Sequence, residues 1–262
     1  MTTHRHIAAL VLGAAAIAAC GTTAQTDITA PAPTTRVLFF NEGLNSPGVN
    51  FFSDSTKLTA VSSSSGLQTP VGTTFSQVAA GGYYTGVAAG AHTLSGRLSD
   101  TTAANHNVII SSVSTTLTSG KSYSYYQSGL YDPVARTLDA FVVEDPVPST
   151  TDYKVANIRF VNAIYNASPG TLTVTNADTS IHPTPAPTVV GSAVAYKNAS
   201  AFVAVPVGSY SLSVAGLGTR TVTHAAVALA AGRYYTITAR GDMTVTTSTS
   251  TNYATLDNQP NR

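Results

Sequence analysis

The fold of this chain is decided by a segment that occurs twice, at residues 36–48 (RVLFFNEGLNSPG) and at residues 157–170 (NIRFVNAIYNASPG). Each copy begins with apolar residues suited to a strand, continues with two asparagines four residues apart, and ends in a Pro-Gly turn. The second copy has one extra residue before its proline. A strand and turn that recur in this way indicate an internal repeat.

Two further pairs of blocks match in the same order along the chain. Residues 90–94 (GAHTL) correspond to residues 208–212 (GSYSL), and residues 117–123 (LTSGKSY) correspond to residues 229–235 (LAAGRYY). Together with the first pair, these blocks define a unit of roughly 110 residues that is present twice, which is a suitable size for a seven-strand sandwich.

Alternation of residue types predicts β-strands inside each unit. At residues 123–128, 211–215 and 233–238 the side chains alternate with a period of two, which is typical of strands that bury one face. Charged residues make up only 10% of the chain, whereas Tyr is abundant at 13 residues. The sequence therefore predicts an all-β protein with two tandem antiparallel β-sandwich domains. Glycines that suit tight turns precede the expected strands at Gly90, Gly120, Gly208 and Gly232.

The chain divides into five expected segments. Residues 1–19 are expected to form a lipoprotein signal peptide, and residues 20–35, rich in Thr and Ala, a flexible tether. The first sandwich is expected at residues 36–145 and the second at residues 154–262. Residues 146–153 contain two prolines, which break a strand and form a short, stiff linker.

The amino terminus carries a lipidation signal. Arg5 gives a positive start, and the uncharged apolar run that follows is shorter than the about 20 residues that a membrane-spanning helix needs. The run ends in Ile17, Ala18, Ala19 and Cys20, which resemble the bacterial lipoprotein signal (lipobox) at every position. By this resemblance, Cys20 is the lipidated first residue of the mature chain.

Cys20 is the only cysteine in the chain, so an internal disulfide is impossible. The alternative interpretation is an ordinary secretory signal with an incidental cysteine. Gly21 stands where an inner-membrane retention signal would have Asp. We therefore expect a bacterial cell-envelope protein that is anchored by lipid on Cys20, with the outer membrane favoured if the cell is Gram-negative.

The repeated motifs also resemble a known family. They are similar to the tandem repeats of the domain-of-unknown-function 4397 family, which occurs in bacterial surface proteins and lipoproteins, over about residues 36–145 and 155–245. The resemblance implies an Ig-like sandwich fold and no activity. Family members usually carry a His-Ala-Ser-Pro stretch after the first strand, of which residues 166–169 (NASP) keep the end.

The charge balance limits the partners. Lys and Arg number 13 and Asp and Glu number 12, and removal of the leader with Arg5 makes the two equal. Such a chain lacks the clustered basic side chains that bind nucleic acid or an anionic membrane surface. The expected partners are the membrane, through the N-terminal lipid, and an envelope protein or a glycan. We expect no nucleic acid and no cofactor.

One local group of carboxylates lies around the expected linker. Asp139, Glu144, Asp145 and Asp152 could supply oxygen ligands for Ca²⁺ at a junction between domains. The simpler interpretation is that linkers are polar because they are solvated. We follow the simpler interpretation and predict no metal site.

Tyr123, Tyr125, Tyr126 and Tyr131 form the densest aromatic group. On a strand, Tyr123 and Tyr125 share one face and Tyr126 lies on the other, so part of the group is expected in the core. Exposed members would instead offer a stacking surface for a glycan or anchors for a protein partner. On that alternative, Tyr125, Tyr126 and Tyr131 are the candidate binding residues.

The sequence shows no arrangement typical of an active site. It has no Gly-x-Ser-x-Gly or Ser-x-x-Lys motif, and residues 120–122 (GKS) lack the earlier glycine of a phosphate-binding loop. These features favour a non-enzymatic protein that acts as a structural spacer or interaction module. A surface glycan- or protein-binding (adhesion-type) module is the alternative, and a hydrolase assembled from distant residues is a third hypothesis. The histidines of the mature chain are far apart, at His92, His106, His182 and His224.

Overall fold

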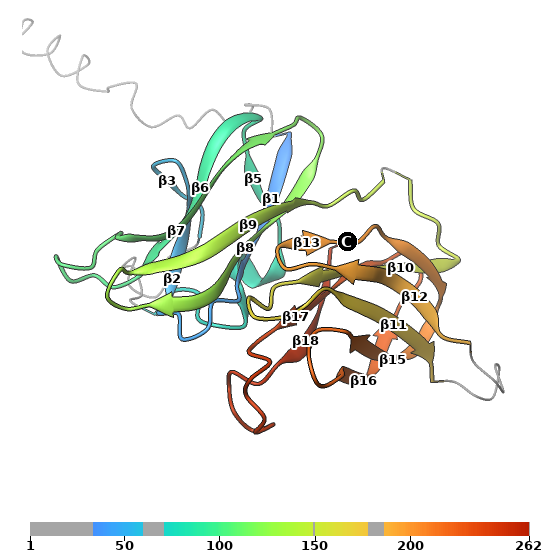
Figure 1. Ribbon diagram of the computed structural model, residues 1–262. Helices are drawn as coiled ribbons and strands as arrows, with labels where there is room; N and C mark the ends of the chain where they lie inside the picture. Colours follow the sequence, from blue (N-terminus) through green and yellow to red (C-terminus); the bar gives the residue numbers. More distant parts are fainter. Residues whose placement is uncertain (1–33, 60–70, 149, 178–185, 262) are drawn as a thin grey trace, which may run out of the picture. The chain divides into compact units, whose positions relative to one another are not determined.

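The computed structural model confirms the all-β sandwich fold (Figure 1). Among the described residues the regular structure is four β-sheets and one short 3₁₀ turn, η1 (Ala79–Gly82). No helix in these residues is long and apolar enough to cross a membrane. Cys20 and His182 lie outside the described residues. The structure describes residues 34–59, 71–148, 150–177 and 186–261.

Strands β1 to β9, which we call the first half, form two sheets that share one core. One sheet has the order β4-β1-β8-β9, with β5 also paired to β1, and the other has the order β3-β2-β6-β7. Both sheets contribute to an apolar cluster that includes Phe39, Phe51, Leu94 and Tyr125. The bounds are β1 (Thr35–Asn41), β2 (Val49–Ser53), β3 (Thr56–Lys57), β4 (Gln77–Val78), β5 (Thr85–Val87), β6 (Gly90–Leu98), β7 (Ile109–Leu117), β8 (Ser122–Asp132) and β9 (Thr137–Glu144).

Strands β10 to β18, which we call the second half, repeat this arrangement. Their sheets have the orders β13-β10-β17-β18, with β14 also paired to β10, and β12-β11-β15-β16. The core of this half includes Phe160, Leu172, Leu212 and Ile237. The bounds are β10 (Val155–Asn162), β11 (Gly170–Asn176), β12 (Thr188–Val194), β13 (Asn198–Ala199), β14 (Val203–Pro206), β15 (Gly208–Ala215), β16 (Val222–Leu229), β17 (Tyr234–Arg240) and β18 (Thr255–Pro260).

One pairing in each half departs from the antiparallel prediction. β1 runs parallel to β8, with Phe39 opposite Tyr125, and β10 runs parallel to β17, with Phe160 opposite Ile237. Parallel neighbours need a long crossover, and strands of the opposite sheet supply it here. Residue alternation shows which side chains share a face but not which strands are neighbours, so the sequence did not reveal this pairing.

The two halves are connected by more than the chain between them. Among the described strands, no hydrogen-bonded pairing joins the first half to the second. Pro33–Arg262 nevertheless form one compact unit. The expected division into separate domains at residues 146–153 therefore stays a prediction.

The repeat extends to single hydrogen bonds. The hydroxyl of Tyr123 accepts the backbone N–H of Thr118 at 3.0 Å, and that of Tyr235 accepts the backbone N–H of Ala230 at 3.0 Å. In both copies a glycine with positive φ turns the chain between the two partners. Matched blocks thus share their contacts as well as their residue types.

Replacing Tyr123 or Tyr235 with phenylalanine is expected to lower the free energy of unfolding by about 1 kcal/mol, because the ring stays packed while one hydrogen bond to the backbone is lost. Urea denaturation followed by circular dichroism measures the change. Tyr83→Phe is the matched control, since the Tyr83 side chain is 77% exposed. Unchanged stability in both buried variants would contradict a stabilising role for these hydrogen bonds.

Candidate functional site

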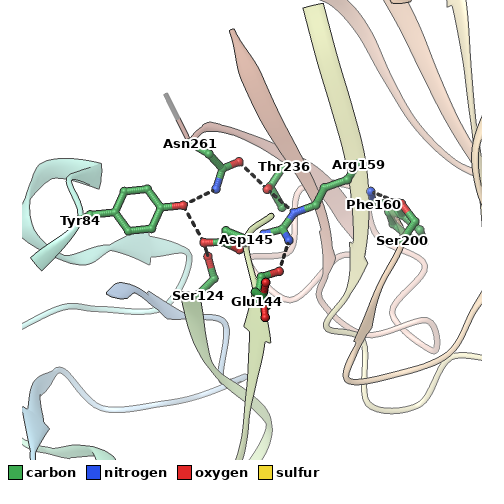
Figure 2. Close-up of polar contacts among 9 residues, drawn as sticks. All are labelled: Tyr84, Ser124, Glu144, Asp145, Arg159, Phe160, Ser200, Thr236 and Asn261. Carbon is green, nitrogen blue, oxygen red and sulfur yellow. Dashed lines mark hydrogen bonds and ion pairs between the residues drawn. The ribbon is translucent and has the colours of Figure 1, made fainter. Parts of the chain in front are cut away.

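A buried ion pair joins the first half to the second (Figure 2). Arg159 on β10 contacts Asp145, which follows β9, and both side chains are 0% exposed. The guanidinium also donates from Nη1 to the carbonyl oxygen of Glu144 at 2.8 Å and from Nε to Thr236 Oγ1 at 2.9 Å. Its central carbon lies 4.9 Å from the centre of the Phe202 ring. These contacts offset the large cost of removing the Arg159 charge from water.

Both carboxyl oxygens of Asp145 have partners. Oδ1 makes the ion pair, and Oδ2 accepts hydrogen bonds from Tyr84 OH at 2.6 Å and from Ser124 Oγ at 2.8 Å. Burial, followed by the charge of Asp145, raises the pKa of Tyr84, so the phenol stays protonated and remains a donor. Asp145 is thus held in the interior by one cation and two hydroxyl groups.

The carboxyl-terminal segment completes this network. Asn261 Nδ2 donates to Tyr84 OH at 3.0 Å, and Thr236 Oγ1 donates to Asn261 Oδ1 at 2.6 Å. Tyr84 belongs to the first half, whereas Thr236 and Asn261 belong to the second (Figure 2). Within this network, the Arg159–Asp145 pair and the hydrogen bond from Asn261 to Tyr84 therefore both cross between the halves.

A second contact between the halves is apolar. The rings of Phe40 and Tyr126 stack with their centres 4.4 Å apart, and the rings of Tyr126 and Phe141 stack at 4.9 Å. From the second half, Val161 on β10 and Ala163 just after this strand complete the cluster. Its buried members are Leu38, Phe40, Tyr126, Phe141, Val161 and Ala163.

Glu42 is a buried carboxyl that also contacts the second half. Its Oε2 has no hydrogen-bond partner, and the nearest cationic atom, Arg240 Nε, is 3.7 Å away. Arg240 forms an ion pair with Asp257, to which it donates hydrogen bonds from both Nε and Nη2. Burial, and secondarily the charge of Asp257, raises the pKa of Glu42 well above its ordinary value. This environment favours the protonated form of Glu42.

The four carboxylates near the expected linker do not form one group, because each has a donor of its own. Within the described residues, no set of three or more His, Cys, Asp or Glu side chains could hold a metal ion. The interpretation of these residues as solvated is wrong for Asp145, which is 2% exposed. The partners are Lys197 for Asp139 (3.0 Å), Lys121 for Glu144 (2.8 Å), Arg159 for Asp145, and the backbone N–H of Lys154 for Asp152 (2.8 Å).

Of the three candidate binding tyrosines, the structure leaves one accessible. Tyr125 lies in the core of the first half and Tyr126 in the contact between the halves, and both are 0% exposed. Neither ring can stack on a glycan in this position, so for these two residues the structure supports the core interpretation. Tyr131 is half-buried and lines a surface pocket beside Pro133.

Ser53, Asp54 and His92 come together without forming a catalytic triad. The Nδ1 atom of His92 lies 2.7 Å from Asp54 Oδ2 and 3.1 Å from Ser53 Oγ. In a triad the acid and the nucleophile contact opposite nitrogens of the imidazole. The shared nitrogen here leaves no base directed at the serine.

Sequence reasoning missed Arg159, Tyr84 and Asn261. Arg159 stands at the repeat position of Leu38, since each lies two residues after the start of the matched block. A charged residue at a position that is apolar in the other copy could have indicated a buried polar contact. Another signal was the apolar run at residues 37–40, because a strand that is apolar on both faces is covered on both. Tyr84 and Asn261 belong to no motif, and the sequence gives no signal for them.

Comparison with known proteins assigns no family: the chain matches no known protein family and no curated protein. The fold and the site therefore define its class by themselves. It is an all-β protein with sandwich-type packing in which two repeated halves share a buried polar network.

Proposed function

We propose that this chain is a lipid-anchored, non-enzymatic protein of the bacterial cell envelope that acts as a structural spacer or interaction module. The anchor rests on Cys20, the only cysteine, which follows a short apolar run and two alanines. Two acyl chains would hold the protein stably at a membrane. Residues 20–35 would then separate the folded part from the bilayer.

The buried Arg159–Asp145 pair is the observation that carries the spacer role. Interfaces between domains of one chain are commonly modest and polar, so relative motion is the default expectation. Here separation of the halves would break a pair whose side chains are both 0% exposed, together with the hydrogen bonds from Arg159 to the carbonyl oxygen of Glu144 and from Asn261 to Tyr84 OH. A connection of this kind would let the tandem unit keep a fixed separation between membrane and partner.

The non-enzymatic assignment rests on the arrangement of the ionisable groups. The meeting of Ser53, Asp54 and His92 has the wrong geometry for nucleophilic catalysis. The buried carboxyls of Asp145 and Glu42 lie in contacts between the halves, where no substrate could reach them without separating those contacts.

Cys20→Ala tests the anchor. Expressed in a Gram-negative bacterium, the wild-type chain is expected in the membrane fraction, with an acylated peptide that begins at Cys20. The variant lacks the thiol that carries the lipid, so it is expected in the soluble fraction or as unprocessed precursor. Fractionation and intact mass measurement distinguish these forms.

The matched control for this experiment is Thr22→Ala, which alters the same segment without touching the thiol. It is expected to fractionate like the wild type. Release of the wild type without lipid would disprove the anchor and leave a secreted protein with an ordinary signal peptide.

A further inference from the structure

Three loops meet at one end of the first half and line an open surface pocket of about 280 Å³. The β1–β2 loop contributes Pro47, the β6–β7 connection contributes Asp100 and Asn105, and the β8–β9 hairpin contributes Tyr131 and Arg136. Both the β6–β7 connection and the β8–β9 hairpin extend to the left in Figure 1. Sandwich folds commonly present their binding residues on loops gathered at one end.

The polar side of this pocket is held in place by hydrogen bonds. Asp100 accepts the side-chain amide of Asn105 at 2.6 Å and the backbone N–H of Thr102 at 2.9 Å. The guanidinium of Arg136 donates from Nη2 to the side-chain oxygen of Asn105, Oδ1. One carboxylate and one guanidinium are thus fixed near each other, and their charges cancel. Hydrogen bonds from Asn105 and Thr102 lower the pKa of Asp100 and so favour its charged form.

The apolar side of the pocket comes from Leu98, Tyr131 and two prolines, Pro47 and Pro133. Tyr131 packs partly against the core of the first half, so its ring is supported from behind. The hairpin that carries it is fixed as well, because Asp132 Oδ1 accepts two backbone N–H groups of the turn, at 2.8 and 3.0 Å. A supported ring and fixed polar groups give the pocket a preformed shape.

A residue that lines this pocket has a larger, buried counterpart in the second half. Ser99 lies nine residues after Gly90, and Leu217 lies nine residues after the matched Gly208. Leu217 is 1% exposed and covers the turn at Gly170, where an added Cβ would lie 2.5 Å from Leu217 Cδ2. In the first half the smaller Ser99 stands at this position and lines the pocket.

We propose that this pocket binds one pyranose ring of an uncharged glycan. The C–H groups of a pyranose face carry partial positive charge and suit the negative face of an aromatic ring such as Tyr131. Neighbouring ring hydroxyls are both donors and acceptors, and the fixed carboxylate and guanidinium of Asp100 and Arg136 can serve both roles. The balanced charge gives no preference for an anionic ligand.

The size of the pocket agrees with a single sugar ring. Its volume of about 280 Å³ lies just below the range of pockets for drug-sized ligands, which begins at roughly 300 Å³. The inference deepens the interaction-module part of the proposed function by naming a ligand class. It does not depend on lipidation, so a failed Cys20 experiment would leave it intact.

Saturation-transfer NMR on the purified chain tests the proposal with a panel of methyl β-glucoside, methyl β-galactoside, methyl α-mannoside and N-acetylglucosamine. At least one of these sugars is expected to bind. Tyr131→Ala and Asp100→Asn are each expected to weaken that binding about tenfold or more. Tyr83→Ala, which removes an exposed tyrosine outside the pocket, is the matched control and should bind as the wild type does.

Ser99→Leu gives the pocket the residue that fills the corresponding place in the second half, and it is expected to abolish binding. Its thermal unfolding, followed by circular dichroism, verifies that the fold is kept. Absence of binding by every sugar of the panel would overturn the proposal. Binding that survives both Tyr131→Ala and Ser99→Leu would overturn it too, as would a response to tetraproline, a probe for extended peptides, without a response to any sugar.

Discussion

Replacing Arg159 with leucine is expected to lower the free energy of unfolding by about 3–5 kcal/mol, because Asp145 then stays buried without its cation. For a chain of this size, the loss corresponds to a fall in Tm of roughly 6–20 °C. Thermal unfolding by calorimetry measures it. The wild type is expected to unfold in one transition, whereas Arg159→Leu is expected to show two as the halves uncouple.

A double-mutant cycle separates the ion pair from the packing around it. Asp145→Asn removes the charge but keeps an oxygen that can accept from Tyr84 and Ser124. The double variant Arg159→Leu/Asp145→Asn is expected to lose clearly less stability than the sum of the two single variants. Lys121→Ala, which removes an exposed ion pair with Glu144, is the control and should change stability little. Additive losses would contradict a direct coupling of Arg159 and Asp145.

Replacing Glu42 with glutamine is expected to stabilise the protein at pH 8 by about 1–3 kcal/mol, because at that pH the unfolded chain has released the Glu42 proton, and folding must either take it up again or bury a charge on an oxygen that has no hydrogen bond. The pKa of Glu42 is raised in the folded protein, so the folded state holds its proton more tightly than the unfolded state does. Stability of the wild type should therefore fall as pH rises from about 4.3, the unfolded value, towards the folded pKa. The glutamine variant has no such proton to lose.

The measurement is urea denaturation of wild type and Glu42→Gln between pH 4 and pH 8. The two stability curves should lie close together near pH 4 and diverge as pH rises. Glu144 is the only other glutamate, and its side chain is 40% exposed, so Glu144→Gln is the matched control and should keep the wild-type slope. A Glu42→Gln variant that is less stable than the wild type at pH 8 would show that Glu42 is ionised and stabilised by Arg240.

The interiors of the two sandwiches could be predicted from the sequence, because local residue patterns encode them. Alternation at Tyr123 and Tyr125 places both on one face of a strand, and both lie in the core of the first half. The glycine before Tyr123 and the one before Tyr235 form the expected turns, with positive φ of 82° and 70°. Each of these features depends on neighbouring residues along the chain.

The contact between the halves could not be predicted in the same way. Alternation predicts that Tyr126 lies on the strand face opposite Tyr125. It does not predict whether solvent, a ligand or another part of the chain covers that face. Asp145 looked like a solvated linker residue because Arg159, its partner, lies on the other side of two prolines in sequence. The pocket lined by Tyr131 could not be predicted from the sequence either, because its lining residues come from three loops that are far apart in the chain.

The sequence by itself determined the all-β class, the internal repeat and some strands of each core, since periodic burial and turn chemistry act over a few residues. The tertiary structure alone decided that β1 pairs in parallel with β8 and that Arg159, Asp145, Tyr84 and Asn261 meet. Only it showed that Ser99 lines a surface pocket, whereas Leu217, at the matched position of the other half, is buried against Gly170. These contacts join residues far apart in the chain, and the energy that selects them, through desolvation and close packing, exists only once both partners are in place.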